Sequence, residues 1–156
     1  MGTDEAAVTE ARPAAGRGAS GRIRVWHLVV LLALVASPVL ALRRLAPIAN
    51  APLLGMLWIV VSVTTYGLYA LDKQRARDGE LRVPEVMLHF AELIGGWPGA
   101  FLAQRRLRHK SSKASYQLVF WLIVLAHLYV VTDFQLDWRL ARAGLQIVRP
   151  AAVRKP

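Results

Sequence analysis

The stretch VPEVMLHFAELIGGWPGAFLA, residues 83–103, decides the fold. It is largely apolar, but it carries Glu85, His89 and Glu92 and is interrupted at its centre by GGWPG, residues 95–99. The interruption leaves two pieces of about ten residues. A helix of that length is about 15 Å long, roughly half the hydrocarbon thickness of a bilayer. The stretch therefore predicts a helix–turn–helix hairpin that enters a membrane and returns.

The centre of this stretch has the composition of a tight turn. Glycine permits positive φ angles, and proline ends a preceding helix. We expect the chain to reverse at Gly95, Gly96, Pro98 and Gly99, which form the structural turn. The alternative is a helix that crosses the membrane, and the stretch would then be a fourth transmembrane segment.

The charges on either side of the stretch favour the hairpin. The preceding loop holds the cations Lys73, Arg75, Arg77 and Arg82. The following loop holds Arg105, Arg106, Arg108, Lys110 and Lys113. Basic loops remain on the cytoplasmic side of a membrane. A crossing helix would put these two loops on opposite sides, whereas a re-entrant hairpin puts both in the cytoplasm.

Three further apolar blocks, residues 25–42, 52–71 and 114–131, are each about long enough to span a bilayer. The charged residues lie in the gaps between blocks, as a hydrocarbon slab requires. The sequence thus predicts an all-α membrane protein with three transmembrane helices plus a re-entrant hairpin, alternatively four transmembrane helices. The first block resembles a signal peptide in part, but Arg43-Arg44 follows it directly, and we expect a retained helix.

The domain organisation follows from the same pattern. Residues 1–24 show no apolar periodicity and are predicted to be a disordered tail. Residues 25–131 form the membrane domain, and residues 132–156 form a C-terminal tail. The chain has no cysteine, which excludes disulfides and cysteine-ligated metals.

The charge of the chain points to an anionic partner. The formal net charge is +10, although 55% of the residues are hydrophobic. Such charge suits lipid headgroups, phosphates or nucleic acid, and the competing interpretation is that most of it is topology signal. We expect membrane lipids, anionic ones in particular, as partners. The predicted ligand-binding residues are Asp72, Lys73, Arg82, Arg108, His109, Lys110 and Lys113.

A second set of residues suggests catalysis instead. Glu85, His89 and Glu92 follow one another at spacings of four and three, so a helix places them on one face. Two carboxylates and an imidazole can ligate a divalent metal or move protons. His109 is a fourth catalytic candidate if the hairpin brings it close. The competing interpretation is structural, with these side chains paired to loop cations.

Several motifs in a fixed order carry a family resemblance over about residues 67–129. They are Asp72-Lys73 with Ala76, Arg82-Val83-Pro84-Glu85, His89, Leu93-Ile94-Gly95-Gly96-Trp97-Pro98-Gly99-Ala100, and Arg108-His109-Lys110 with Lys113. In these residues the chain resembles the small bacterial integral membrane proteins of the family called domain of unknown function 1294. The resemblance implies a multi-pass protein of the bacterial inner membrane and implies no activity.

Three functions remain open at this point. The first is binding of an anionic headgroup or phosphate-bearing ligand at a basic cytoplasmic face. The second is a membrane-embedded, metal-dependent enzyme that uses Glu85, His89 and Glu92. The third is a membrane tether for nucleic acid, suggested by the charge and by relatives that carry a cold-shock domain. Nucleic acid ranks last because aromatic residues do not interleave with the basic runs.

Overall fold

The computed structural model describes residues 22–47 and 49–148, and every regular element among them is helical. The elements are α1 (Val25–Leu45), α2 (Ala51–Asp78), α3 (Glu85–Ala91), the π-helix η1 (Glu92–Gly96), α4 (Trp97–Leu107), α5 (Ala114–Gln135) and α6 (Arg139–Val148). The tail predicted for residues 1–24 lies mostly outside the described residues.

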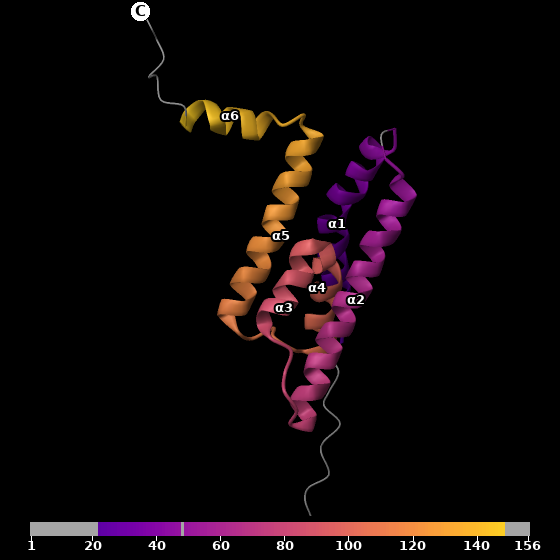
Figure 1. Ribbon diagram of the computed structural model, residues 1–156, viewed down its shortest axis with the longest axis vertical. Coiled ribbons are helices and arrows are strands. Elements are labelled where there is room, and N and C mark those ends of the chain that lie inside the picture. Colours follow the sequence, from indigo (N-terminus) through magenta and orange to yellow (C-terminus); the bar gives the residue numbers. More distant parts are fainter. Residues whose placement is uncertain (1–21, 48, 149–156) are drawn as a thin grey trace, which may run out of the picture.

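Four segments are long and apolar enough to cross a membrane: Val25–Leu45, Ala51–Asp78, Glu85–Leu107 and Ala114–Gln135. They correspond to the four apolar blocks of the sequence, except that the third begins at Glu85 and not at Val83. Helices α1, α2 and α5 form the long frame of the molecule, and α6 lies across one end of that frame (Figure 1). The all-α membrane fold expected from the sequence is therefore confirmed at the level of helices able to span a bilayer.

The segment Glu85–Leu107 reverses direction, and we call α3, η1 and α4 together the hairpin. Its contacts with α2 establish the reversal. On the way in, the N–H of Val83 binds Asp72 and the carboxylate of Glu92 binds Tyr69. The tip at Gly95 reaches Trp58. On the way out the chain passes the same stretch of α2 in the opposite direction (Figure 1).

The reversal is made by the glycines that the sequence pointed to. Gly95 has φ 112° and ψ 1°, a conformation that side-chain-bearing residues rarely adopt. Pro98 lies in the first turn of α4, where proline is tolerated. Gly99 packs directly on α2, since a β-carbon there would overlap the backbone of Ser62. Glycine thus provides both the turn and the close approach.

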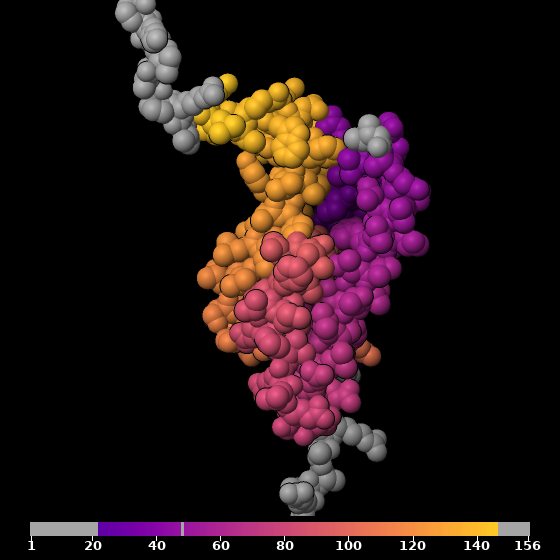
Figure 2. All heavy atoms as spheres, in the orientation of Figure 1, coloured from indigo at the N-terminus to yellow at the C-terminus, as the bar shows by residue number. Residues whose placement is uncertain are grey.

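The core of the molecule lies between the hairpin and the frame. Its largest fully buried apolar side chains are Trp97, Phe101, Leu88 and Phe120. On the face shown in Figure 2, the hairpin fills the space between α2 and α5. The hairpin therefore supplies much of the interior that the frame helices enclose.

Several helices continue beyond their predicted apolar blocks, among them α2 and α5. Helix α2 runs through the charged residues after Leu71 and ends at Asp78, because this stretch consists mostly of good helix formers. It stops at Gly79, whose φ of 74° forms a left-handed cap. Helix α5 continues to Gln135, and the buried carboxylate of Asp133 then accepts hydrogen bonds from the first N–H groups of α6.

Candidate functional site

Both loops that flank the hairpin lie at one end of the molecule, which we call the basic end. Asp72, near the end of α2, is fully buried there. Its Oδ1 accepts a hydrogen bond of 3.0 Å from the N–H of Val83, and its Oδ2 lies 2.6 Å from Nε2 of His109. The ammonium of Lys110 is 3.7 Å from the same carboxylate. One buried carboxylate thus ties together the chain before the hairpin and the chain after it.

A second carboxylate binds the loop after the hairpin to the first residue of the hairpin. Glu85, the first residue of α3, accepts hydrogen bonds from Lys110 at 2.9 Å and from Lys113 at 2.8 Å. The loop that presents these lysines has left-handed backbone at Arg108 (φ 48°) and Lys110 (φ 60°). Such conformations are uncommon for side-chain-bearing residues and cluster at functional sites. The ion pairs hold this strained loop against the start of the hairpin.

An open pocket of about 480 Å³ lies at the basic end, and we call it the basic pocket. Its lining residues are Lys73, Ala76, Arg77, Arg82, Glu85, Arg108, His109, Lys110, Ser112 and Lys113. Six of them are lysine or arginine, and Glu85 is the one carboxylate among them. Within the described residues, nothing forms a hydrogen bond or ion pair with the guanidinium group of Arg82 or of Arg108. The pocket therefore presents cationic donors to whatever enters it.

A cluster of polar side chains lies between the hairpin, α2 and α5, and we call it the buried network: Tyr69, His89, Glu92, Gln104 and Tyr116. Glu92 is fully buried and accepts hydrogen bonds from the hydroxyls of both tyrosines. The two hydroxyl oxygens are 2.6 Å apart, and Gln104 donates to that of Tyr69 at 3.1 Å. Nδ1 of His89 lies 2.7 Å from the second oxygen of Glu92.

The buried network reaches the basic pocket through Tyr116 and Lys110. The ring of Tyr116 stacks on His89, with centroids 4.1 Å apart, and the ammonium of Lys110 lies 5.7 Å from the centre of the same ring. Gln117 donates both to Gln104 at 2.8 Å and to the carbonyl oxygen of Lys110 at 3.0 Å. A continuous chain of polar contacts thus runs from the pocket to Glu92.

The residues predicted to bind a ligand are brought together. Lys73, Arg82, Arg108, His109, Lys110 and Lys113 all line the basic pocket. Asp72 lies directly behind it and orients His109. Lys73 also donates to the carbonyl oxygen of Leu107, which fastens the end of α4 to α2.

The catalytic and metal candidates do not converge. Glu85 faces Lys110 and Lys113, whereas His89 and Glu92 turn into the buried network. His109 pairs with Asp72 instead of approaching them. Among the described residues, no group of three His, Asp or Glu side chains is arranged to hold a metal ion.

Tyr69, Gln104 and Tyr116 were not predicted as site residues. Tyr69 is fully buried against Glu92. A carboxylate within an apolar segment needs partners, because burying an unpaired charge is costly. That requirement is the signal that would have directed attention to polar groups in the neighbouring helices.

Comparison with known proteins bears on the same segment. Residues 62–116 match the family described as "Protein of unknown function (DUF1294)". The chain is similar to this family over these residues. The matched segment contains the second half of α2, the whole hairpin, the loop after it and the start of α5, and so every residue of the basic pocket and of the buried network. No curated protein and no solved structure matches the chain.

Proposed function

We propose that the protein is a multi-pass protein of the bacterial inner membrane in which the hairpin is re-entrant and the basic pocket binds an anionic headgroup or phosphate-bearing ligand at the cytoplasmic face. The observation that carries the proposal is the basic pocket itself. Six cationic side chains face one carboxylate there, and Arg82 and Arg108 have no partner within the described residues. Guanidinium groups bind phosphate oxygens in pairs through their planar N–H fork.

The distribution of charge supports a cytoplasmic position for this pocket. Of the described residues, eleven lysines and arginines lie at the basic end: Arg22, Arg24, Lys73, Arg75, Arg77, Arg82, Arg105, Arg106, Arg108, Lys110 and Lys113. Four lie at the other end: Arg43, Arg44, Arg139 and Arg142. The positive-inside rule assigns the richer end to the cytoplasm.

The geometry of the loop supports a binding role. Arg108 and Lys110 are held in left-handed backbone by the contacts of His109 and Lys110 with Asp72 and Glu85. The two carboxylates thereby fix the loop before any ligand arrives. A preorganised site loses less freedom on binding, which favours affinity.

Binding is better supported than the two alternatives. A metal-dependent enzyme would need Glu85 near His89 and Glu92, but Glu85 is occupied by two lysines. A nucleic-acid tether would need aromatic side chains on which bases can stack. The lining of the basic pocket includes no phenylalanine, tyrosine or tryptophan.

The test is native mass spectrometry of the full chain in maltoside micelles. The probes are phosphatidylglycerol, phosphatidylcholine and glycerol 3-phosphate, which separate an anionic lipid from a zwitterionic lipid and from a free phosphate ester. Arg82→Ala and Arg108→Ala should each weaken retention of phosphatidylglycerol or glycerol 3-phosphate about tenfold, the effect of one charge-assisted hydrogen bond. Added salt should reduce the difference, since screening already weakens the wild-type contact.

Arg43→Ala is the matched control, because Arg43 is an exposed arginine in the last turn of α1 at the opposite end. It should leave retention unchanged. Equal retention of all three probes, or equal loss in Arg43→Ala and Arg108→Ala, would contradict the proposal. A co-purifying metal whose loss follows Glu92→Gln or His89→Ala would favour the enzyme instead.

A further inference from the structure

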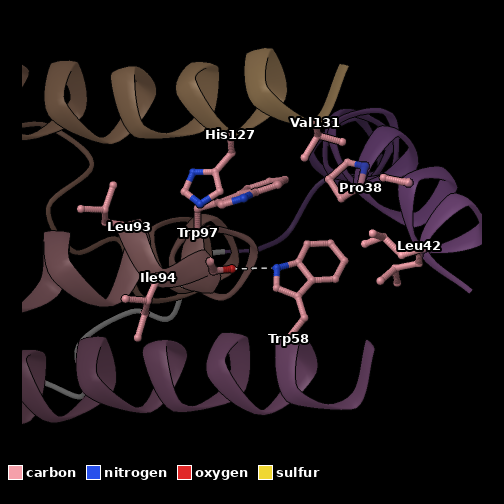
Figure 3. Close-up of a pocket in the computed structure, with 11 residues that line it drawn as sticks. Pro38, Leu42, Trp58, Leu93, Ile94, Trp97, His127 and Val131 are labelled. Atoms are coloured by element: carbon pink, nitrogen blue, oxygen red, sulfur yellow. Dashed lines mark hydrogen bonds between the residues drawn. The ribbon is translucent and has the colours of Figure 1, made fainter. Parts of the chain in front are cut away.

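The hairpin is shorter than the helices around it, and this leaves a cavity between its tip and the end of the molecule opposite the basic end. The tip at Gly95 is held level with Trp58 by a hydrogen bond of 2.8 Å from the indole N–H to the carbonyl oxygen. Trp58 is the eighth residue of α2, so the tip stops about 10 Å short of the end of that helix. The space beyond it is a cavity of about 310 Å³, which we call the apolar pocket (Figure 3).

The walls of the apolar pocket come from α1, α2, the hairpin and α5. Pro38 and Leu42 of α1, Trp58 of α2, Ile94 and Trp97 of the hairpin, and His127 of α5 face one another across it (Figure 3). Polar contacts fasten α1 to α5 beside it. Gln135 donates to the carbonyl oxygen of Ser37 at 2.9 Å and to its hydroxyl at 3.0 Å. The pocket is therefore built by the fold at the end opposite the basic pocket.

His127 contributes one hydrogen-bond acceptor to this apolar space. Its Nδ1 lies 2.9 Å from the carbonyl oxygen of Ile123. Because a carbonyl oxygen can only accept, Nδ1 must carry the hydrogen, and Nε2 of the neutral ring is left as an acceptor. No described residue donates to Nε2. No fully enclosed side-chain nitrogen or oxygen of the described part lacks a partner, so Nε2 is not fully enclosed, and the His127 ring lines the pocket.

A water molecule is a poor partner for this acceptor. Water in a protein cavity needs two to four polar partners. The indole N–H of Trp58 is already used by the carbonyl oxygen of Gly95, so the lining offers a water no free donor, and the rest of it is almost wholly apolar. An occupant that combines a single hydroxyl with an apolar body satisfies Nε2 and fills the remaining space.

We propose that the apolar pocket binds a membrane-soluble phenol, such as a hydroquinone, whose hydroxyl donates to Nε2 of His127 and whose ring lies against Trp58 and Trp97. The two indoles favour an aromatic ring over an alkyl chain, because aromatic rings gain from edge and offset contacts with one another. A phenolic hydroxyl is also more acidic than an alcohol and so a stronger donor. The volume is that of a small-ligand site, about 300 Å³ or more, lined by apolar groups with few polar ones.

The test compares two ligands that differ only in the donor. 4-Decylphenol carries the hydroxyl, and 4-decylanisole carries a methyl ether in its place. Binding is measured by calorimetry on the full chain in phosphatidylcholine nanodiscs, with empty nanodiscs as the reference for partitioning. The phenol should bind in a 1:1 complex at least about tenfold more tightly than the ether, because the ether leaves the acceptor unsatisfied.

Two variants locate the site. His127→Phe should abolish the preference for the phenol, and Ile94→Trp should fill the cavity and abolish binding of both ligands. Arg108→Ala, at the other end of the molecule, should leave both the preference for the phenol and the binding of the two ligands unchanged. A failure of this proposal can therefore be distinguished from a failure of the proposed function of the basic pocket. The proposal is overturned if wild-type protein binds phenol and ether equally, or if 1-decanol binds as tightly as the phenol. It is also overturned if no binding exceeds that of empty nanodiscs, in which case a lipid chain fills the pocket.

Discussion

The hairpin and α1 are both apolar in sequence, yet they occupy opposite environments. In the most apolar window of each segment, 56% of the hairpin residues are buried within the protein, compared with 6% for α1. Helix α1 contains no carboxylate and no glycine, whereas the hairpin carries two carboxylates and three glycines. Hydropathy therefore indicates that a segment suits a membrane, but it does not say whether the segment faces lipid or protein.

The difference in environment explains why the hairpin tolerates its broken backbone. Irregular backbone at membrane depth is possible only where protein or water covers it. Here Trp58 satisfies the carbonyl oxygen of Gly95, and the tip packs against α2. Helix α1 is continuous, and its backbone is paired within the helix except at Pro38, so it needs little such cover. Each of the following substitutions tests this contrast, with stability measured by unfolding in SDS from maltoside micelles.

The largest effect is expected at the contact between the hairpin and α2. In Gly99→Val the new β-carbon would overlap the backbone carbonyl oxygen of Ser62, which cannot rotate away. We expect a loss of about 4 kcal/mol or more in the free energy of unfolding. Gly67→Ala is the control, because a β-carbon at Gly67 meets no atom within 4 Å. Equal stability of the two variants would show that the close packing is absent.

A matched pair of leucines tests the contrast in burial directly. Leu88 of the hairpin is fully buried, and Leu32 of α1 is 68% exposed. Leu88→Ala should cost about 3 kcal/mol because it leaves a cavity in packed protein. Leu32→Ala should change the free energy of unfolding little in comparison, since lipid or detergent can fill the space. A reversed order would contradict the assignment of the two environments.

The buried network should respond to the loss of a single hydroxyl. Tyr69→Phe deprives Glu92 of a donor and Gln104 of an acceptor, both of them fully buried. The expected cost is about 2 kcal/mol. Tyr129→Phe is the control, because Tyr129 is 51% exposed. A difference of less than about 0.5 kcal/mol between the two would mean that water replaces the missing hydroxyl in the network.

The smallest effect is expected at the rim of the basic pocket. The side chain of Lys113 is 53% exposed, and Lys110 also binds Glu85. Lys113→Ala should therefore cost less than about 1 kcal/mol of stability, as exposed ion pairs do. In the same variant, the amount of anionic lipid retained should fall measurably, whereas the free energy of unfolding should change little. A large loss of stability would instead assign Lys113 to the structural base of the hairpin.

The helices and the meeting of the two basic loops were predictable, because charge segregation in the sequence reflects the solvent that each residue meets. The residues at which helices end were less predictable. The charged residues after Leu71 resemble a loop in a hydropathy pattern, but they continue α2 to Asp78. Here local helix propensity and the cap at Gly79 determine the boundary, and neither depends on hydropathy.

The candidate site was predictable where its residues are charged and close in sequence. The cations of the basic pocket stood out because charges are costly near a membrane. Tyr69 and Tyr116 did not, because tyrosine within an apolar segment is equally typical of packing or of an interface. Only the fold shows that both hydroxyls meet at Glu92, since the three residues lie on different elements.

The most direct test of this account is the sidedness of the two loops that flank the hairpin. The chain has no native cysteine, so Glu80→Cys, Ser112→Cys and Ala49→Cys each introduce a single reporter. An impermeant maleimide is applied to spheroplasts and to inverted membrane vesicles. A re-entrant hairpin predicts that positions 80 and 112 are labelled only in inverted vesicles, and that position 49 is labelled only in spheroplasts. Labelling of positions 80 and 112 from opposite sides would show that the segment crosses the membrane and would contradict the account.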